Sequence, residues 1–452
     1  MVSVYVGRCE GTDADEVTRH VRAGFDALGV APSRAGDVIL QPACPWSHPR
    51  YAPDACTEPA TIEGIAHAFG DSRLSLGIQS LPGFPTRYTA AKTGYDALAG
   101  RIGASVVRFD EASFRRMPDA MLGGPSTEPG EDATQTPLSV ADGWRAASFR
   151  VSVPRLVGST TLPFAGALRH LYDVLPQGLQ TEQHHRIGEA IGVLARVATP
   201  DLIVLDGIRA THEGGELSGT PLDLGVLMIG TDPVAVDLVA AAAYGVPEGE
   251  LSWMPAATAR GDAPRSVSDV EIVGDLSLAD VRGLADRVRR LDPNPERFPL
   301  PAKVRVARSP KTRLSGPSGA LTEVFAMLRR AGIALDGARE TTLVLGPADA
   351  IPDGTTDYST IVFMGDTARG DYKGYSRVVR LQGRNLPVSQ VLQDVPFAMT
   401  VANVRSELGW QFLAAGWAAS LSRLLGGGRR VGAGESPPLQ TEGGGDRGRD
   451  GG

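Results

Sequence analysis

Lysine is nearly absent from this chain of 452 residues. Only four of its 45 Lys and Arg residues are lysines, and none lies between Lys92 and Lys303. A Schiff-base mechanism requires a desolvated lysine amine. The sequence therefore argues against pyridoxal phosphate as a cofactor of the central region.

Cysteine is equally scarce, with Cys9, Cys44 and Cys56 as the three copies and no CxxC pair among them. This set cannot build a disulfide framework, a four-cysteine zinc site or an iron–sulfur cluster by itself. We expect buried thiols, and no iron–sulfur cofactor.

Excess basic charge is also missing. The net charge is -7 and the pI is about 5.6, whereas binding to polyphosphate requires a clustered basic surface. We therefore expect small molecules or proteins as partners, and neither nucleic acid nor an anionic membrane.

Long apolar runs do not occur either. The chain opens on an apolar stretch at residues 2–6 without the basic and apolar segments of a signal peptide, which predicts a cytoplasmic protein. Near the other end, Glu407 and Arg423 limit an uncharged run to about 15 residues, short of the roughly 20 that span a bilayer. For residues 401–425 we expect an amphipathic helix packed on the protein, with self-association, partner binding or a membrane surface as alternatives.

Apolar strand-like runs alternate with helical patterns along most of the chain. The expected strands are residues 2–6, 38–40, 74–78, 105–109, 149–153, 202–205, 224–229, 342–345 and 361–364, and residues 13–28 show helical spacing. Such alternation predicts an α/β fold with a mainly parallel or mixed sheet flanked by helices.

Composition divides the chain into segments. Residues 1–290 are expected to form the main α/β domain, with a mobile insertion at 117–137 that is rich in Pro, Gly, Ser and Thr. A proline-rich linker at 291–310 leads to a smaller C-terminal α/β unit at 311–425, and residues 426–452 are expected to be disordered. Richness in Gly, Ala, Arg and Pro suggests a bacterial genome of high GC content.

The stretch from Pro200 to Gly245 combines the strongest fold signals with polar residues. An apolar strand at 202–205 is followed by the turn signal Asp206-Gly207, and a second strand by Asp232 and Pro233 at the start of a helix that ends at Gly245. We expect Asp206 to lie at the end of its strand.

Three sequence blocks resemble the domain-of-unknown-function 362 family. They read DLIVLDGI, EGGELSG and GTDPVAVD in the central stretch, PRLVGSTTLPFAGALRHLYD from Pro154, and DVILQPACPWSHP from Asp37. Residues Arg155 and Arg169 stand where the family has lysines, and Ser159 stands where it has a histidine. The resemblance implies that these three bind substrate, while the ferredoxin-like module of many members is absent.

Acid–base chemistry is the first hypothesis for the central stretch. Asp206, His212 and Glu213 are expected in one strand-end loop, where open α/β sheets bind ligands. A carboxylate beside an imidazole supplies a general base and acid. The alternative is that Asp206 only caps its turn.

Two further groups extend the predicted site. His184 and His185 are expected on a helix over 181–197, so one of them faces the site; with His170, Asp206 and Glu213 they could instead ligate a divalent metal. Gly214, Gly215 and Gly219 either approach a ligand or turn the chain tightly, and Arg155 and Arg169 are expected to clamp an anion.

The combined prediction is a cytoplasmic bacterial enzyme of small-molecule, or specialised, metabolism. It would act on an anionic metabolite as an isomerase, lyase or cyclase. Two alternatives remain open: a flavin- or ferredoxin-linked oxidoreductase, and a non-catalytic accessory or binding protein.

Overall fold

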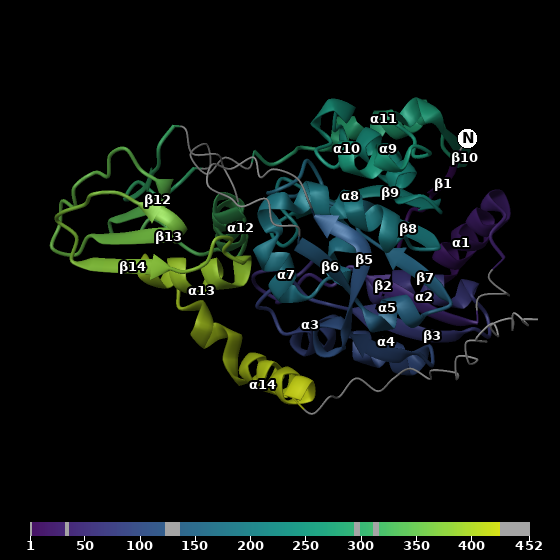
Figure 1. Ribbon diagram of the computed structural model, residues 1–452, viewed down its shortest axis with the longest axis horizontal. Helices are drawn as coiled ribbons and strands as arrows, with labels where there is room; N and C mark the ends of the chain where they lie inside the picture. The colour runs from purple at the N-terminus through teal and green to yellow at the C-terminus, as the bar shows by residue number, and fades with distance from the viewer. Residues whose placement is uncertain (1, 32–35, 123–135, 293–298, 311–315, 425–452) are drawn as a thin grey trace, which may run out of the picture.

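A computed structural model describes residues 2–31, 36–122, 136–292, 299–310 and 316–424. Figure 1 shows a large sheet between helices, with a second, smaller sheet to one side. The α/β class expected from the alternating pattern is confirmed. Residues 426–452, for which disorder was predicted, lie outside the described residues.

The large sheet has eight strands in the order β10-β1-β9-β8-β7-β2-β3-β4. All pairings are parallel except those of β9 with β1 and with β8. Its strands are β1 (Val2–Arg8), β2 (Asp37–Pro42), β3 (Arg73–Ile78), β4 (Ser105–Arg108), β7 (Phe149–Val153), β8 (Leu202–His212), β9 (Thr220–Gly230) and β10 (Val270–Gly274). The mixed sheet thus has its parallel strands ending at a common edge.

Helices cover both faces of this sheet. They are α1 (Ala14–Leu28), α2 (Pro59–Ala68), α3 (Thr86–Thr93), α4 (Tyr95–Arg101), α5 (Asp142–Ala146), α6 (Ala167–Leu171), α7 (Gln177–Glu182), α8 (Ile187–Val197), α9 (Pro233–Tyr244), α10 (Met254–Ala257) and α11 (Leu278–Gly283). One core joins the sheet to α1, α2 and α4, and another joins its opposite face to α6, α8 and α9.

Local signals explain where these helices start and stop. Asp232 caps α9 by accepting hydrogen bonds from the amides of Val234 and Ala235, at 2.8 and 3.1 Å. Gly245 ends the helix with a left-handed φ of 73°, a conformation that costs glycine little. The predicted start and end of this helix are therefore confirmed.

The C-terminal unit is a parallel four-stranded sheet with helices on one face. It comprises β11 (Val304–Ala307), α12 (Gly316–Arg330), β12 (Thr341–Pro347), β13 (Thr360–Arg369), β14 (Arg377–Leu381), α13 (Val388–Ala398) and α14 (Val404–Leu424). Figure 1 shows α12 and α13 on the side of the small sheet that faces the large one. Because β11 falls within the predicted linker 291–310, regular structure begins earlier than expected.

The predicted insertion at 117–137 has strands at both of its ends. Strand β5 (Phe114–Leu122) pairs antiparallel with β6 (Thr136–Ala141). The residues between them, 123–135, lie outside the described part of the chain. The expectation of an irregular segment therefore does not hold at these ends, where β5 and β6 pair and the side chains of Ala120 and Leu122 are buried.

One apolar core is shared between the two sheets. Trp46, Tyr51, Phe84 and Leu217 from the main part pack in the same cluster as Leu321 and Phe325 of α12. Polar contacts add to it: Ser389 donates a hydrogen bond to the carbonyl of Pro82 over 2.8 Å. The C-terminal unit is thus packed firmly against the loops of the large sheet.

Candidate functional site

Strand β8 does not end at Asp206. It continues to His212 and pairs antiparallel with β9, with a register shift between Gly207 and Arg209. Six residues of strand place Asp206 and His212 about 20 Å apart. The expected turn at Asp206 is therefore wrong, because cross-strand pairing to β9 overrides the Asp-Gly signal. Asp206 lies apart from His212 and Glu213, whose imidazole and carboxylate are 3.9 Å from each other.

Asp206 is buried near Arg155. Its Oδ1 accepts a hydrogen bond from the amide of Ile208 at 3.1 Å, while Oδ2 has no hydrogen-bond partner among the described residues. Burial raises the pKa of this carboxyl, and the charge of Arg155 opposes the rise. The bond to Ile208 is a local contact within β8, next to the register shift, and does not cap a turn as the alternative expected.

His212 and Glu213 contact the segment around Arg289. The Nδ1 of His212 accepts a hydrogen bond from the amide of Arg289 at 3.2 Å. The Glu213 carboxylate pairs with the Arg289 guanidinium at 2.6 Å, and the backbone of Glu213 has a positive φ of 54°. These contacts anchor the chain that leads toward the C-terminal unit.

The three glycines of the β8–β9 hairpin loop allow close packing. A Cβ on Gly215 would lie 1.8 Å from Oε2 of Glu323, and one on Gly219 would lie 2.4 Å from Oγ1 of Thr211. A Cβ on Gly214 would meet the backbone of Gly219 at 2.6 Å. Of the two predicted roles, tight turning is the one with a direct geometric basis.

A cavity of about 70 Å³ lies where this hairpin loop meets the C-terminal unit. The loop after β3, helices α6, α7 and α12, and the start of α13 supply its walls. Its titratable lining residues are Arg169, Tyr172, His184, Glu216 and Glu323. A mostly apolar lining with a few convergent polar groups is typical of small-molecule sites.

Arg169 is fully engaged in ion pairs. Its guanidinium contacts Asp173 at 2.9 Å and binds both carboxylate oxygens of Glu216, at 2.9 and 3.0 Å. Burial raises the pKa of both carboxyls, and the charge of Arg169 opposes the rise. Arg169 therefore positions two acids at the cavity wall, where we had expected it to clamp an anion.

Glu323 is an acidic residue of α12 that the sequence analysis did not single out. Its Oε1 accepts hydrogen bonds from the amides of Leu217 and Ser218, at 2.6 and 2.9 Å. Its Oε2 has no hydrogen-bond partner in the described part of the chain. Burial raises the pKa of this carboxyl to about 7.

His184 and His185 differ sharply in their surroundings. The predicted helix over 181–197 is interrupted by a 3₁₀ turn at His184–Arg186, between α7 and α8. His184 lines the cavity, and burial lowers its pKa to about 4. His185 lies within 3.1 Å of the carbonyl of Glu182 and 3.2 Å of the side chain of Asn385.

A second cavity of about 30 Å³ adjoins the first, and Arg169 and Glu216 line both. Arg155 lines this smaller one and donates hydrogen bonds to the carbonyls of Asp54, Cys56 and Arg209. Among the described residues, no carboxylate lies within ion-pair distance of Arg155. Its guanidinium donates to carbonyl oxygens, and Asp206 is the carboxyl that feels its charge.

Ser159 shapes the wall between these cavities and the hairpin loop. Its Oγ accepts hydrogen bonds from the amides of Thr161 and Leu162, at 3.3 and 3.2 Å. Thr161 in turn lines the larger cavity. Ser159 therefore acts through the loop conformation in this structure.

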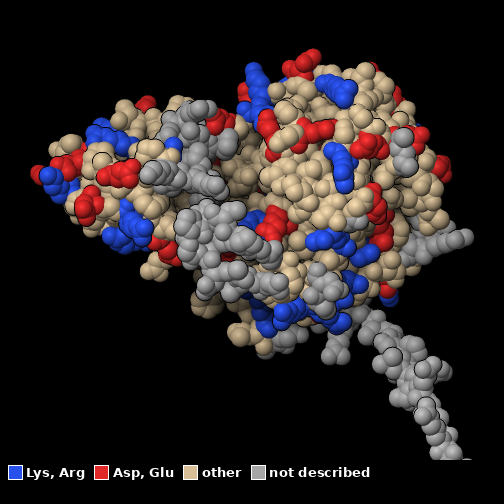
Figure 2. Space-filling view, turned by 45° about the horizontal axis from the view of Figure 1, so that its top comes forward, with Lys and Arg blue, Asp and Glu red and all other residues tan. Residues whose placement is uncertain are grey.

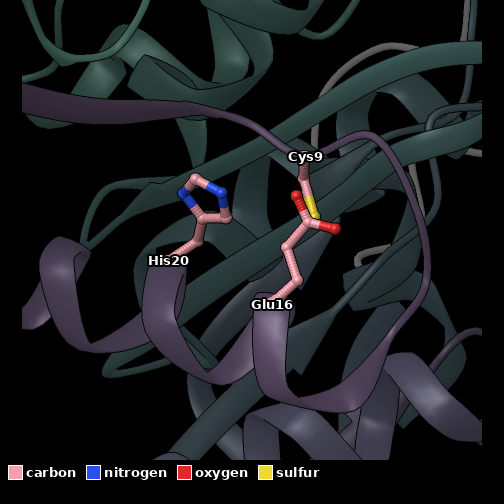
Figure 3. A group of neighbouring side chains, drawn as sticks. All are labelled: Cys9, Glu16 and His20. Atoms are coloured by element: carbon pink, nitrogen blue, oxygen red, sulfur yellow. The ribbon is translucent and has the colours of Figure 1, made fainter.

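The predicted residues divide into two groups. Arg155, Arg169, His170 and His184 line the two cavities, while Asp206, His212, Glu213, His185 and Ser159 do not. The histidine–carboxylate set considered as metal ligands is likewise not gathered. Potential ligands converge instead at Cys9, Glu16 and His20, far from the predicted set in sequence (Figure 3).

Comparisons with known proteins agree with the sequence resemblance. Residues 38–242 match the sequence model of the family described as domain of unknown function (DUF362). A thylakoid-associated protein of Synechocystis sp. is 22% identical over 247 residues, which cover 52% of this chain and 73% of that protein. The lactate racemase apoprotein of Thermoanaerobacterium thermosaccharolyticum shares 12% identity at a TM-score of 0.32, covering 51% of this chain and 54% of that one.

Proposed function

We propose that the chain, of which residues 38–242 match the sequence model of the family described as domain of unknown function (DUF362), is a small-molecule enzyme of acid–base type. Its site is the larger cavity between the hairpin loop and the C-terminal unit. An isomerase, lyase or cyclase reaction fits such a site, because each needs proton transfer without a redox cofactor. The three buried, unpaired cysteines support a reducing compartment such as the bacterial cytoplasm.

The observation that carries the proposal is the raised pKa of the buried Glu323 carboxyl at the cavity wall. A carboxyl whose pKa lies near 7 exchanges a proton readily at neutral pH, which is the property of an efficient general acid or base. Two backbone amides hold one of its oxygens and so fix its orientation at the cavity wall. Glu323 is therefore the proposed proton-transfer residue.

His184 is the proposed second group. Burial lowers its pKa to about 4, so its imidazole is neutral at pH 7 and can accept a proton or a hydrogen bond. Both residues line the same cavity but come from different parts of the chain. In this proposal Glu323 transfers the proton, and the neutral imidazole of His184 accepts a hydrogen bond from the ligand.

An anionic group on the ligand remains the proposed recognition feature. Arg155 supports it, because its buried charge lies against the smaller cavity without a paired carboxylate among the described residues. Arg169 contributes indirectly by holding Glu216 in the partition between the cavities. We propose that the ligand is a small carboxylate or phosphate that bears an exchangeable proton.

The test begins with binding, since the substrate is unknown. Full-length protein would be screened by thermal shift against a panel of small carboxylates and phosphates, with neutral analogues as controls. We expect anionic members to raise the melting temperature, and Arg155→Gln to abolish that rise. Equal shifts with neutral analogues, or shifts unchanged in Arg155→Gln, would remove the anion-binding proposal.

A compound that binds in this screen then allows the proposed proton transfer by Glu323 to be tested. In deuterium oxide, a proton-transfer enzyme should exchange a carbon-bound hydrogen of the bound compound, visible by NMR. We expect Glu323→Gln to slow this exchange at least tenfold while binding persists, and Glu182→Gln to leave it unchanged because Glu182 is exposed. Exchange at the wild-type rate in Glu323→Gln would refute its role.

A further inference from the structure

Three side chains with metal-binding atoms converge at the end of β1. The thiol of Cys9, the carboxylate of Glu16 and the imidazole of His20 place one atom each within 4.8 Å of one another. Figure 3 shows the Cys9 thiol against the Glu16 carboxylate, with His20 on the next turn of α1. We propose that this group, the Cys9–Glu16–His20 triad, binds a divalent transition metal of the zinc type.

The local fold brings the triad together. Strand β1 ends at Arg8, so Cys9 follows it directly, and Asp13 caps the start of α1 through the amides of Asp15 and Glu16. Glu16 and His20 are four residues apart and therefore share one face of α1. That face is turned toward the end of β1, which makes the triad a product of the strand–loop–helix connection.

His20 is held in the orientation that a metal ligand needs. Its Nδ1 lies 3.0 Å from the hydroxyl of Tyr5 and 3.7 Å from a carboxylate oxygen of Asp275. Histidine ligands commonly donate the hydrogen of the nitrogen that does not bind the metal to a carboxylate or similar acceptor, which fixes the ring and its tautomer. Nδ1 thus contacts Tyr5 and Asp275, and Nε2 is the ring nitrogen that would bind the ion.

The chemistry of the three groups selects the ion. Thiolate and imidazole together favour zinc or its spectroscopic substitute cobalt over magnesium or calcium, which prefer oxygen ligands alone. Cys9 and His20 are buried, while the Glu16 side chain is 24% exposed and gives a route from solvent. Three protein ligands leave a fourth position for water or a substrate atom.

The position of the triad within the sheet is that of a ligand site. Strands β1 and β8 are parallel to one another on either side of β9, and Gly7 and Asp206 both pair with Leu227. Cys9 therefore lies at the carboxyl edge of the parallel strands, where open α/β sheets bind ligands. Two strand spacings separate Gly7 from Asp206, about 10 Å. The triad does not line either cavity, so this inference stands apart from the proposed function.

The experiment measures binding of cobalt and zinc to the full-length protein. Chelator-treated protein would be titrated with Co²⁺, and a thiolate ligand should produce a charge-transfer band in the near ultraviolet together with the visible bands of a tetrahedral ion. We expect saturation near one ion per chain, loss of the charge-transfer band in Cys9→Ser, and displacement of cobalt by Zn²⁺.

Two further variants separate binding from folding. Glu16→Gln, at a partly exposed position, should fold normally yet bind Co²⁺ at least tenfold more weakly. Cys56→Ser, which changes another buried cysteine, should keep the full charge-transfer band if it folds, and His67→Gln, on the exposed side of α2, should keep full affinity. Titration without a charge-transfer band, or equal affinity in Glu16→Gln, would overturn the proposal.

Discussion

At the scale of single residues, Glu323 combines two roles that depend on its burial. It joins α12 to the hairpin loop by accepting two backbone amides, and it keeps a carboxyl oxygen without a hydrogen-bond partner in the described structure. Burial disfavours the charged form and so raises its pKa from 4.5 to about 7. The same residue therefore links the two parts of the chain and supplies an exchangeable proton.

This raised pKa predicts a pH-dependent stability. The folded state holds the proton of Glu323 more tightly than the unfolded state, so its contribution is complete below pH 4.5 and is lost as pH rises to about 7. The free energy of unfolding of the wild type, relative to that of Glu323→Gln, should therefore fall as pH rises across this window. Chemical denaturation at several pH values measures it.

Glu182→Gln provides the matched control, because the same substitution at an exposed carboxyl should leave the pH profile parallel to that of wild type. A constant difference between wild type and Glu323→Gln from pH 4.5 to pH 8 would show that the carboxyl titrates normally.

Gly215 offers a second test at this scale. A Cβ there would overlap Oε2 of Glu323, so Gly215→Ala should destabilise the protein by about 1–3 kcal/mol, the usual cost of overpacking. Gly178, in the exposed first turn of α7, has open space around it, and Gly178→Ala should leave stability equal or slightly higher. Urea denaturation of both variants checks the contrast, which equal effects would contradict.

Glu323 also shows why the site could be predicted only in part. The sequence indicated Arg155, Arg169 and His184 through family-like positions and clustering, and these line the cavities. Glu323 belongs to no motif, and the available signal was a single acid within the apolar run ALTEVFAML. Its partners, Leu217 and Ser218, are over a hundred residues away, so no local pattern could pair them.

At the scale of elements, α14 has two dissimilar faces. Val404, Leu408 and Phe412 are buried against the protein, whereas Trp410, Trp417 and Leu424 are 79–83% exposed. A non-helical conformation at Gly409, with a φ of 69°, breaks the helix near its start. The expected packing of residues 401–425 on the protein is found, and association through the exposed face stays a prediction.

Exposed aromatic residues at helical spacing predict self-association of the full chain through α14. The double variant Trp410→Ser, Trp417→Ser should shift the protein toward monomer, because it removes most of the apolar area of that face. Sedimentation equilibrium over a range of concentrations measures the shift. Tyr358→Ser, at another exposed aromatic, is the control. Wild type that stays monomeric throughout would contradict self-association.

Elements with strong local signals were the ones predicted well. Strands β1, β2, β3, β7, β12 and β13 fall where apolar runs placed them, and α1 covers the residues that showed helical spacing. The strand predicted at 202–205 was too short, because an Asp-Gly pair usually marks a turn. In the structure this pair lies inside the long hairpin of β8 and β9. Pairing of β8 with β9 therefore determines where this strand ends.

At the scale of the whole molecule, the larger cavity depends on both sheets. Main-domain loops and the helices of the C-terminal unit each supply walls, and a shared apolar core holds them together. Figure 2 shows acidic and basic side chains interspersed over the drawn face, in line with the near-balanced composition. No helix among those described is long and apolar enough to cross a membrane.

This joint architecture could not be foreseen from local pattern. The sequence indicated a main α/β part and a smaller C-terminal one, but Trp46, Phe84 and Leu217 lie in separate loops. Nothing in their spacing shows that they meet α12. The location of the cavity therefore follows from packing between distant segments.

Native mass spectrometry of the full-length protein with a small-metabolite extract tests the central claim most directly. Thr161→Trp would place a large side chain in the lining of the larger cavity from a half-buried position, whereas Thr220→Trp changes an exposed residue outside it. The account predicts a small-molecule adduct in wild type and Thr220→Trp that is lost in folded Thr161→Trp. An adduct retained at the same occupancy in Thr161→Trp, or no adduct in any form, would contradict it.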